Sequence, residues 1–127
     1  MVTILYIEDA ALNRRLVQKC LKTLNYRFLE ATDGLSGVEK ARTEIPDLIL
    51  IDYHLPDIDG IEVARLIRQI DALKHTPLIA LTADMSGRVR DTCLNGDFDE
   101  HLTKPISRAY LIRVIEQLLK ARSQPAY

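Results

Sequence analysis

Short apolar runs alternate along the chain with longer stretches in which apolar residues recur at helical spacing. This alternation is typical of strand–helix units arranged around a parallel sheet, and five such units follow one another. The pattern therefore predicts an α/β fold. The predicted strands cover Thr3–Ile7, Arg27–Ala31, Leu48–Asp52, Leu78–Thr82 and Phe98–Thr103.

Three of the predicted strands contain apolar runs without polar alternation, at Ile4–Ile7, Leu48–Ile51 and Leu78–Leu81. Strands covered by helices on both faces have this composition, so we place these three in the centre of the sheet. The other two strands carry charges, around Phe28–Glu30 and Asp99–His101. Charged residues suit edge strands, which must avoid pairing with other chains.

Each predicted strand is followed by a helix. The first four helices are predicted over Ala11–Leu24, Leu35–Glu44, Ile61–Ile70 and Met85–Leu94, and the fifth begins after Ser107. Serine favours the N-cap position, where its hydroxyl accepts a backbone N–H of the first turn. We expect the domain to occupy residues 1–122 and residues 123–127 to form a frayed tail.

The first and fourth predicted helices differ in their apolar surface. The first has a stripe at a spacing of four, expected to face the sheet. Its members are Leu12, Leu16, Cys20 and Leu24, flanked by Val17 and Leu21. In the fourth, Ser86–Gly87 lowers the helix propensity. Only Met85, Val89 and Cys93 form a thin stripe there, so we expect this helix to be the most loosely held.

Length and composition favour a single cytoplasmic domain. A chain of 127 residues with 47% hydrophobic content can bury one continuous core.

The formal net charge of -1 gives no field that would attract nucleic acid or an anionic membrane, so neither is expected as a partner. The longest apolar run, Leu48–Ile51, is far short of the ~20 residues that span a bilayer, and no signal peptide is recognisable. Cys20 and Cys93 lack metal-site spacing and are expected as reduced thiols.

Polar side chains gather where the predicted strands end. Glu8–Asp9 follow the first strand, Asp52 ends the third, Thr82 ends the fourth, and Lys104 follows the fifth. Open parallel sheets bind ligands outside the carboxyl ends of their strands. The sequence therefore predicts a site at this rim with three carboxylates, a hydroxyl and an ammonium group.

Three carboxylates at one rim need a compensating charge. Two of them about 4 Å apart repel by about 4 kcal/mol at an effective dielectric constant of about 20. Hard oxygen ligands with room for water suit Mg²⁺, so we expect a magnesium ion, or Mn²⁺ in its place. The alternative is a group of acids that only cap the strand ends.

Four segments closely resemble the motifs of response-regulator receiver domains. They are LYIEDAALNRRLV at 5–17, DLILIDYHLPDIDGIEVARLIR at 47–68, PLIALTAD at 77–84 and HLTKPI at 101–106. The resemblance covers essentially the whole chain, with the motifs in order. It implies a doubly wound, flavodoxin-like (βα)5 fold with strand order 2-1-3-4-5 and a cis peptide bond at Lys104–Pro105.

The resemblance also implies a metal site. Asp9 and Asp52 are expected to bind the ion directly, together with the backbone carbonyl of His54. Glu8 is expected to act mainly through a water molecule. The Asp59–Gly60 pair that closes the following loop is expected to be structural, with Asp59 as a helix cap.

The resemblance assigns Asp52 as the residue that accepts a phosphoryl group. Lys104 would neutralise the phosphoryl oxygens on the side opposite the metal, and Thr82 would donate its hydroxyl once the group is attached. His54 and Asp84 stand at positions that flank the path of the hydrolysing water, so we expect them to tune the lifetime of the phosphate. Ordinary exposed side chains are the alternative for this pair.

The chain departs from the family pattern at His101. Three residues before the lysine, receivers usually carry Tyr or Phe, which turns inward as the threonine moves. We hypothesise that His101 is a smaller, titratable version of this switch. A plain edge-strand histidine is the alternative.

The resemblance predicts a phosphorylation switch of a two-component or phosphorelay system. Its donor would be a phosphohistidine on a histidine kinase or a histidine phosphotransfer protein, and its output is open. We expect a stand-alone receiver, although an N-terminal receiver of a longer protein would show the same residues. It would catalyse only its own phosphoryl acceptance and slow autodephosphorylation.

Three rivals remain at this point. A phosphatase of the haloacid dehalogenase type needs a second acid two residues after its nucleophile, where this chain has His54. A flavodoxin-like electron carrier binds a flavin phosphate in its first loop, and Glu8–Asp9 would repel that phosphate. A degenerate receiver that only binds partners would not need the complete acidic set.

Overall fold

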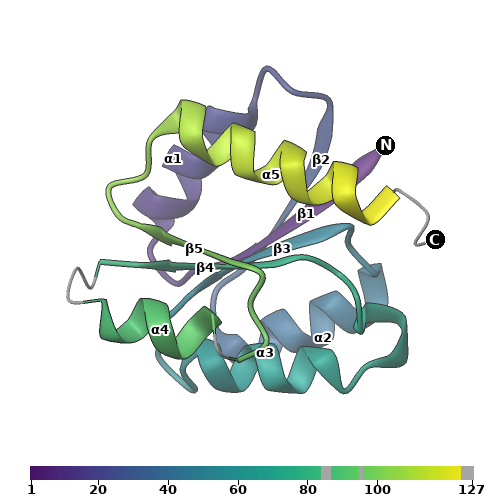
Figure 1. The fold of residues 1–127 in the computed structure, drawn as a ribbon, viewed down its shortest axis with the longest axis vertical. Helices are drawn as coiled ribbons and strands as arrows, with labels where there is room; N and C mark the ends of the chain where they lie inside the picture. Colours follow the sequence, from purple (N-terminus) through teal and green to yellow (C-terminus); the bar gives the residue numbers. More distant parts are fainter. Residues whose placement is uncertain (84–86, 95, 124–127) are drawn as a thin grey trace.

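One parallel sheet forms the centre of the molecule (Figure 1). The structure is a computed structural model and describes residues 1–83, 87–94 and 96–123. Within these residues the strands pair in the order β2-β1-β3-β4-β5, which confirms the predicted order. Their bounds are β1 Val2–Ile7, β2 Tyr26–Ala31, β3 Leu48–Asp52, β4 Leu78–Thr82 and β5 Glu100–Thr103.

Helices cover both faces of the sheet, as Figure 1 shows. On one face lie α1 (Ala11–Leu21) and α5 (Arg108–Ser123), and on the other α2 (Gly34–Glu44), α3 (Gly60–Arg68) and α4 (Arg88–Leu94). A short 3-10 helix, Asp71–Leu73, precedes β4. This arrangement confirms the predicted doubly wound α/β fold. Among the described residues, every helix is too short or too polar to span a bilayer.

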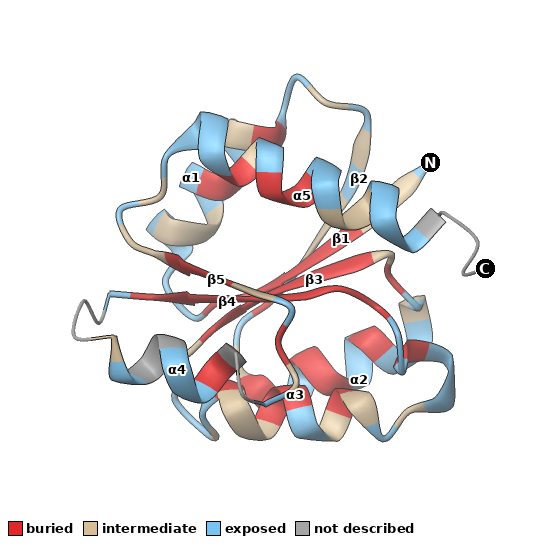
Figure 2. Cartoon of the chain, viewed as in Figure 1, coloured by how far each residue is buried: buried red, intermediate tan, exposed pale blue. Residues whose placement is uncertain are grey.

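The three central strands carry the core (Figure 2). β3 and β4 are buried along their whole length, and β1 is buried from Ile4 onward. Each Leu or Ile side chain buried there contributes about 1.5–3 kcal/mol relative to exposure. The apolar runs therefore identified the centre of the sheet correctly, because two covered faces leave no position for polar residues.

The prediction for the surface of the first helix is wrong in part. Val17 and Leu21 of α1 are buried against the sheet, whereas Leu12 and Leu16 are 63% and 53% exposed. A spacing of four exceeds the 3.6 residues of a helical turn. Leu12 and Leu21, nine positions apart at about 100° per residue, lie on opposite sides of the axis, so the face that buries Leu21 leaves Leu12 exposed. Leu24 lies beyond α1, which ends at Leu21 and not at the predicted Leu24.

Helix ends follow the side chains that cap them. Asp59 accepts the backbone N–H of Glu62 at 2.9 Å and so begins α3. Ser107 accepts the N–H of Tyr110 at 3.3 Å and begins α5. The predicted stripe of the fourth helix lies only partly within the described residues. Cys93 is buried, and Met85 falls outside them.

Candidate functional site

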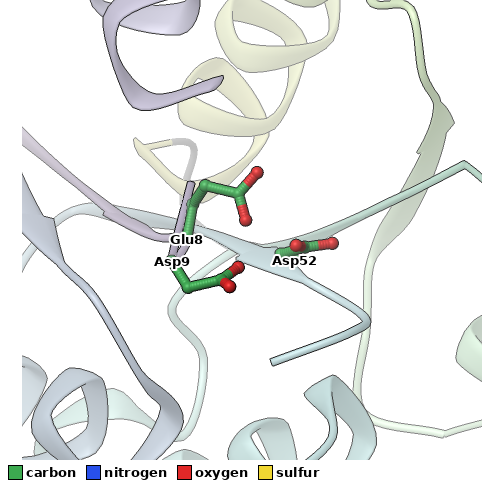
Figure 3. A group of neighbouring side chains, drawn as sticks. All are labelled: Glu8, Asp9 and Asp52. Atoms are coloured by element: carbon green, nitrogen blue, oxygen red, sulfur yellow. The ribbon is translucent and has the colours of Figure 1, made fainter. Parts of the chain in front are cut away.

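Three carboxylates meet where β1 and β3 end. Ile7 of β1 pairs with Ile51 of β3, so Glu8 and Asp9 follow β1 beside Asp52. Oxygen atoms of Glu8, Asp9 and Asp52 lie within 4.8 Å of one another, and Figure 3 shows the three side chains turned toward a common space. Glu8 is fully buried, Asp52 is 6% exposed, and Asp9 is exposed. The strand-end residues thus come together as the topology requires.

An ammonium group reaches the acids from the neighbouring strand end. The Lys104 backbone N–H donates to Thr82 O at 2.7 Å, which holds this residue beside the end of β4. The Lys104 Nζ atom lies 3.0 Å from Glu8 Oε1 and 3.4 Å from Asp52 Oδ1. The peptide bond from Lys104 to Pro105 is cis, as the resemblance implied.

The pKa values of the two buried acids, Asp52 and Glu8, are shifted in opposite directions. Burial raises the pKa of Asp52 to about 7, together with its hydrogen bond to Glu8 and the charge of that residue. Burial also acts to raise the pKa of Glu8, but hydrogen bonds with Asp52, Lys104 and Asn13 lower it below its usual value. One ammonium group is not enough to neutralise this cluster, so the acids retain unbalanced negative charge.

Helix α1 supplies two donors that the sequence reasoning missed. Asn13 donates its side-chain amide to Glu8 Oε1. Arg14 donates to the backbone carbonyls of Glu8 at 2.8 Å and Asp9 at 3.0 Å. Both residues lie in the first turns of the helix that follows Glu8–Asp9. One sequence feature could have indicated them. Because the predicted helix begins only a few residues after Glu8–Asp9, side chains in its first turns lie close to the end of the strand.

The remaining predicted site residues are buried to different depths. Thr82 is fully buried at the end of β4, one position beyond Leu81, the pairing partner of Asp52. His101 is 7% exposed and lies on β5. His54 is exposed, and its backbone N–H donates to Asp52 Oδ1 at 3.4 Å. Asp84 falls outside the described residues.

The loop after β3 folds back onto the Asp52 backbone. Gly60 donates its N–H to Tyr53 O at 2.8 Å. A Cβ atom at Gly60 would lie 2.9 Å from both Asp52 O and Tyr53 Cα, a distance that real Cβ contacts do not tolerate. Glycine is needed here for this close approach, and the Asp59–Gly60 pair is structural, as predicted.

A second group of acids lies beside the starts of α2 and α3, and we call Asp33, Asp57 and Asp59 the capping acids. Asp33 accepts the N–H of Ser36 at 2.8 Å. Asp57 accepts the N–H groups of Gly34 and Leu35, both at 2.8 Å. Together with Asp59, they satisfy four of the N–H groups that α2 and α3 leave free in their first turns.

Comparison with known proteins relates this geometry to a family. The family model of the response regulator receiver domain matches residues 4–116. The chain is 37% identical over 119 residues to the sensor histidine kinase CheAY of Helicobacter pylori, covering 92% of this chain and 15% of that kinase. It is 32% identical over 117 residues to the polar-differentiation response regulator DivK of Brucella anthropi, covering 92% and 95% of the two chains.

A solved structure gives the same result in three dimensions. The receiver domain of the sensor histidine kinase PA1611 from Pseudomonas aeruginosa, solved with a magnesium ion in its active site cleft, superposes with a TM-score of 0.87 at 34% identity. The match covers 94% of this chain and 98% of that one. The phosphatase and electron-carrier alternatives are thereby set aside. The chain belongs to the response-regulator receiver-domain family of two-component signalling systems.

Proposed function

We propose that Asp52 is the phosphoacceptor of this receiver domain. The observation that carries the proposal is the position of the Lys104 ammonium group, 3.0 Å from Glu8 Oε1 and 3.4 Å from Asp52 Oδ1. A cation beside a buried carboxylate can neutralise the charge of a phosphoryl group as that group moves to the carboxylate. Asp52 supplies the nucleophile, and Lys104 supplies positive charge on one side of the transferring phosphoryl group.

We infer that Mg²⁺, or Mn²⁺ in its place, is held by Asp9, Asp52 and the backbone carbonyl of His54, with Glu8 acting through a water. The donor set fits, because carboxylate and carbonyl oxygens are the ligands that Mg²⁺ prefers. Within residues 1–83, 87–94 and 96–123, the buried Glu8 Oε2 atom has no hydrogen-bond partner, so acceptor capacity at the cluster is unused. When bound, the ion adds positive charge on the second side of the phosphoryl group.

The chain's own residues carry the transfer as follows. A carboxylate oxygen of Asp52 attacks phosphorus, and its O–P bond forms as the P–N bond of the phosphohistidine breaks. The donor imidazole leaves and takes up a proton. Lys104 and Thr82 hold the phosphoryl oxygens by a charge and a hydroxyl donor. Water later attacks the acyl phosphate and releases inorganic phosphate, which restores the Asp52 carboxylate.

Thr82 and His101 transmit the change to the surface of the domain. Thr82 moves its hydroxyl toward the phosphoryl group, and the buried ring of His101 on the next strand follows. Reversing a 1:99 population requires about 5.5 kcal/mol of differential stabilisation, which several charge-assisted hydrogen bonds can supply. If His101 takes no part, His101→Gln will leave the binding of donor or output partner unchanged between about pH 5.5 and 8. His54 and Asp84 set the lifetime of the phosphate.

Receiver domains of this kind are signalling switches that interact with histidine kinases and output partners. For this chain, we propose a phosphohistidine on a histidine kinase or a histidine phosphotransfer protein as the donor. The domain would extend over residues 1–122 and act in the cytoplasm. Its catalysis would be limited to its own phosphoryl acceptance and slow autodephosphorylation.

Intact-mass spectrometry after incubation with acetyl phosphate and Mg²⁺ tests the proposal. The unchanged protein should gain the mass of one phosphoryl group, and chelation of Mg²⁺ with EDTA should prevent the gain. Asp52→Asn should show no gain, whereas Asp57→Asn, a matched change in an acid that only caps α2, should behave like the unchanged protein. A protein that binds Mg²⁺ but gains no mass would be a degenerate receiver and would refute the proposal.

A further inference from the structure

Tyr6 lies next to the acid cluster on the same face of the sheet. The ladder continues past the end of β1, because the Glu8 N–H donates to Ala31 O at 2.9 Å. Side chains two positions apart on an extended strand point to the same face. Tyr6 and Glu8 therefore both point toward the side covered by α1 and α5, and both are fully buried.

Each of these two side chains has a polar atom without a partner. Among the residues that the structure describes, neither the buried Tyr6 hydroxyl nor the buried Glu8 Oε2 atom has a partner of hydrogen-bond geometry, although the hydroxyl lies near enough to Glu8 for that carboxylate to raise its pKa. A buried polar group left unpaired costs about 1–3 kcal/mol, so two such groups in one small region call for an explanation. The other carboxylate oxygen, Glu8 Oε1, already accepts from Asn13 and Lys104.

Lys104 is shared between two roles that conflict. Its Nζ atom now lies 3.0 Å from Glu8 Oε1 and somewhat farther, 3.4 Å, from Asp52 Oδ1. Once Asp52 carries a phosphoryl group, Lys104 must turn toward its oxygens. Glu8 then loses its cationic donor while it remains buried, and a carboxylate in that state needs a replacement.

Tyr6 has the right chemistry to provide that replacement. The pKa of a tyrosine hydroxyl is about 10 even in water, so the group is protonated at neutral pH and can donate a hydrogen bond. Tyr6, Asn13 and Lys104 also line one cavity of about 740 Å³ between α1 and the segment after β5. Open space beside these side chains permits the small movements required.

We propose that Tyr6 is a positioning residue of the site, whose hydroxyl donates to Glu8 Oε2 when Lys104 turns toward Asp52. In this position Tyr6 keeps the Glu8 carboxylate directed at the metal without touching the reacting atoms. The inference rests on the proposed function of Asp52. Packing of the core explains why the Tyr6 ring is buried. The proposed hydrogen bond to Glu8 explains why the buried residue has a hydroxyl.

The test compares Tyr6→Phe with Tyr26→Phe, a matched control that removes a hydroxyl from the same side of the sheet. Tyr26 is half-buried at the far end of β2, where its pairing partner is Val2. Isothermal titration calorimetry with Mg²⁺ alone, and with Mg²⁺ plus beryllofluoride as the phosphoryl mimic, measures binding. With beryllofluoride present, Tyr6→Phe should weaken Mg²⁺ binding by about tenfold, the low end of the effect of an outer-shell partner. With Mg²⁺ alone the loss should be smaller, because Lys104 still lies beside Glu8. Tyr26→Phe should bind like the unchanged protein.

Two further readouts separate positioning from packing. Without Mg²⁺, Tyr6→Phe should be at least as stable to urea as the unchanged protein, because it loses an unpaired hydroxyl. In the unchanged protein with labelled tyrosine, the Tyr6 Cζ resonance should shift when Mg²⁺ and beryllofluoride are added, and that of Tyr26 should not. This NMR measurement detects a change at Tyr6 in the unchanged protein, so it does not depend on whether a variant folds.

The outcomes distinguish this inference from the proposed function. Equal Mg²⁺ affinity of all three proteins in the presence of beryllofluoride, or a Tyr6 resonance that does not respond, would overturn the role of Tyr6 and leave Asp52 as the phosphoacceptor. Absence of Mg²⁺ binding in the unchanged protein would overturn both. Weakened binding with unchanged stability and a shifted resonance would support the role of Tyr6.

Discussion

The two groups of acids, the cluster of Glu8, Asp9 and Asp52 and the capping acids, use the same chemical group in opposite ways. Asp57 and its neighbours are paired with backbone N–H groups of α2 and α3, and these hydrogen bonds lower the pKa of Asp57 even though slight burial acts to raise it. In the cluster, Asp52 is buried beside another acid and its pKa is raised to about 7. The capping acids stabilise the fold, whereas the cluster holds negative charge that the fold does not satisfy.

The difference shows where function is located in this domain. A carboxylate whose oxygens accept backbone N–H groups of its own chain is less available to a ligand. In the cluster, one ammonium group is shared between Glu8 and Asp52, and Glu8 Oε2 has no hydrogen-bond partner among the described residues. Unsatisfied charge costs stability and is retained at sites that bind an ion or accept a group. The comparison predicts opposite effects for substitutions in the two groups.

Loss of the shared cation should have the largest effect. Lys104→Met should slow phosphorylation by acetyl phosphate by about 100-fold, because one of the charges that stabilise the transferring group is removed. Mass spectrometry over time measures the rate. Lys74→Met is the control, since Lys74 is exposed, lies away from the acid cluster in sequence and forms an ion pair with Asp71 at 3.3 Å. Equal rates in the two variants would contradict the role given to Lys104.

Asp52→Asn should stabilise the protein at neutral pH in the absence of Mg²⁺. The pKa of Asp52 is about 7 when folded, against about 3.9 unfolded, so the folded state binds more protons between these values. The stability of the unchanged protein should therefore fall as pH rises from about 4 to 7. The variant lacks this loss and should be more stable by on the order of 2 kcal/mol above pH 7, with little difference near pH 4. Urea unfolding at the two pH values measures it. A destabilised variant at neutral pH would show that Asp52 is satisfied in the fold.

Substitution of a capping acid should have a smaller effect of opposite sign. Asp57→Ala removes the acceptor of two N–H groups at the start of α2 and should lower the free energy of unfolding by about 1 kcal/mol. Its phosphorylation rate should not change. Urea unfolding and the mass assay check the two parts. A changed rate with unchanged stability would mean that Asp57 belongs to the functional group of acids.

The smallest effect on stability and phosphorylation is expected for an acid that forms a solvent-exposed ion pair. Glu62 on α3 forms an exposed ion pair with Arg65, and such pairs contribute little because solvent already satisfies both charges. Glu62→Gln should leave both the unfolding midpoint and the phosphorylation rate unchanged. A clear loss of either would show that charge on the α3 surface matters beyond local pairing.

The strands, their order and the convergence of Glu8, Asp52, Thr82 and Lys104 could be predicted from the sequence. Apolar runs mark strands buried on both faces, and parallel topology brings their carboxyl ends to one rim. Strand ends agree with the prediction, although β5 begins at Glu100 rather than Phe98. The catalytic and switch roles of these residues stay predictions, as does the domain boundary at residue 122.

The contacts of α1 could not be predicted. Which side of a helix faces the sheet depends on its rotation, and a stripe at spacing four misjudged that rotation for Leu12 and Leu16. The hydrogen bonds of Asn13 and Arg14 to the strand end depend on the same rotation. The unpaired hydroxyl of Tyr6 was equally hidden, because an apolar run containing tyrosine shows only that the ring is buried.

The most direct test of the account locates the phosphoryl group itself. The protein is phosphorylated with acetyl phosphate and Mg²⁺, reduced with borohydride, which converts an aspartyl phosphate into homoserine, and mapped by peptide mass spectrometry. The account predicts homoserine in place of Asp52 only, and none when Mg²⁺ is withheld. Reduction at Asp9, Asp57 or another acid while Asp52 remains intact would contradict the assignment of the site.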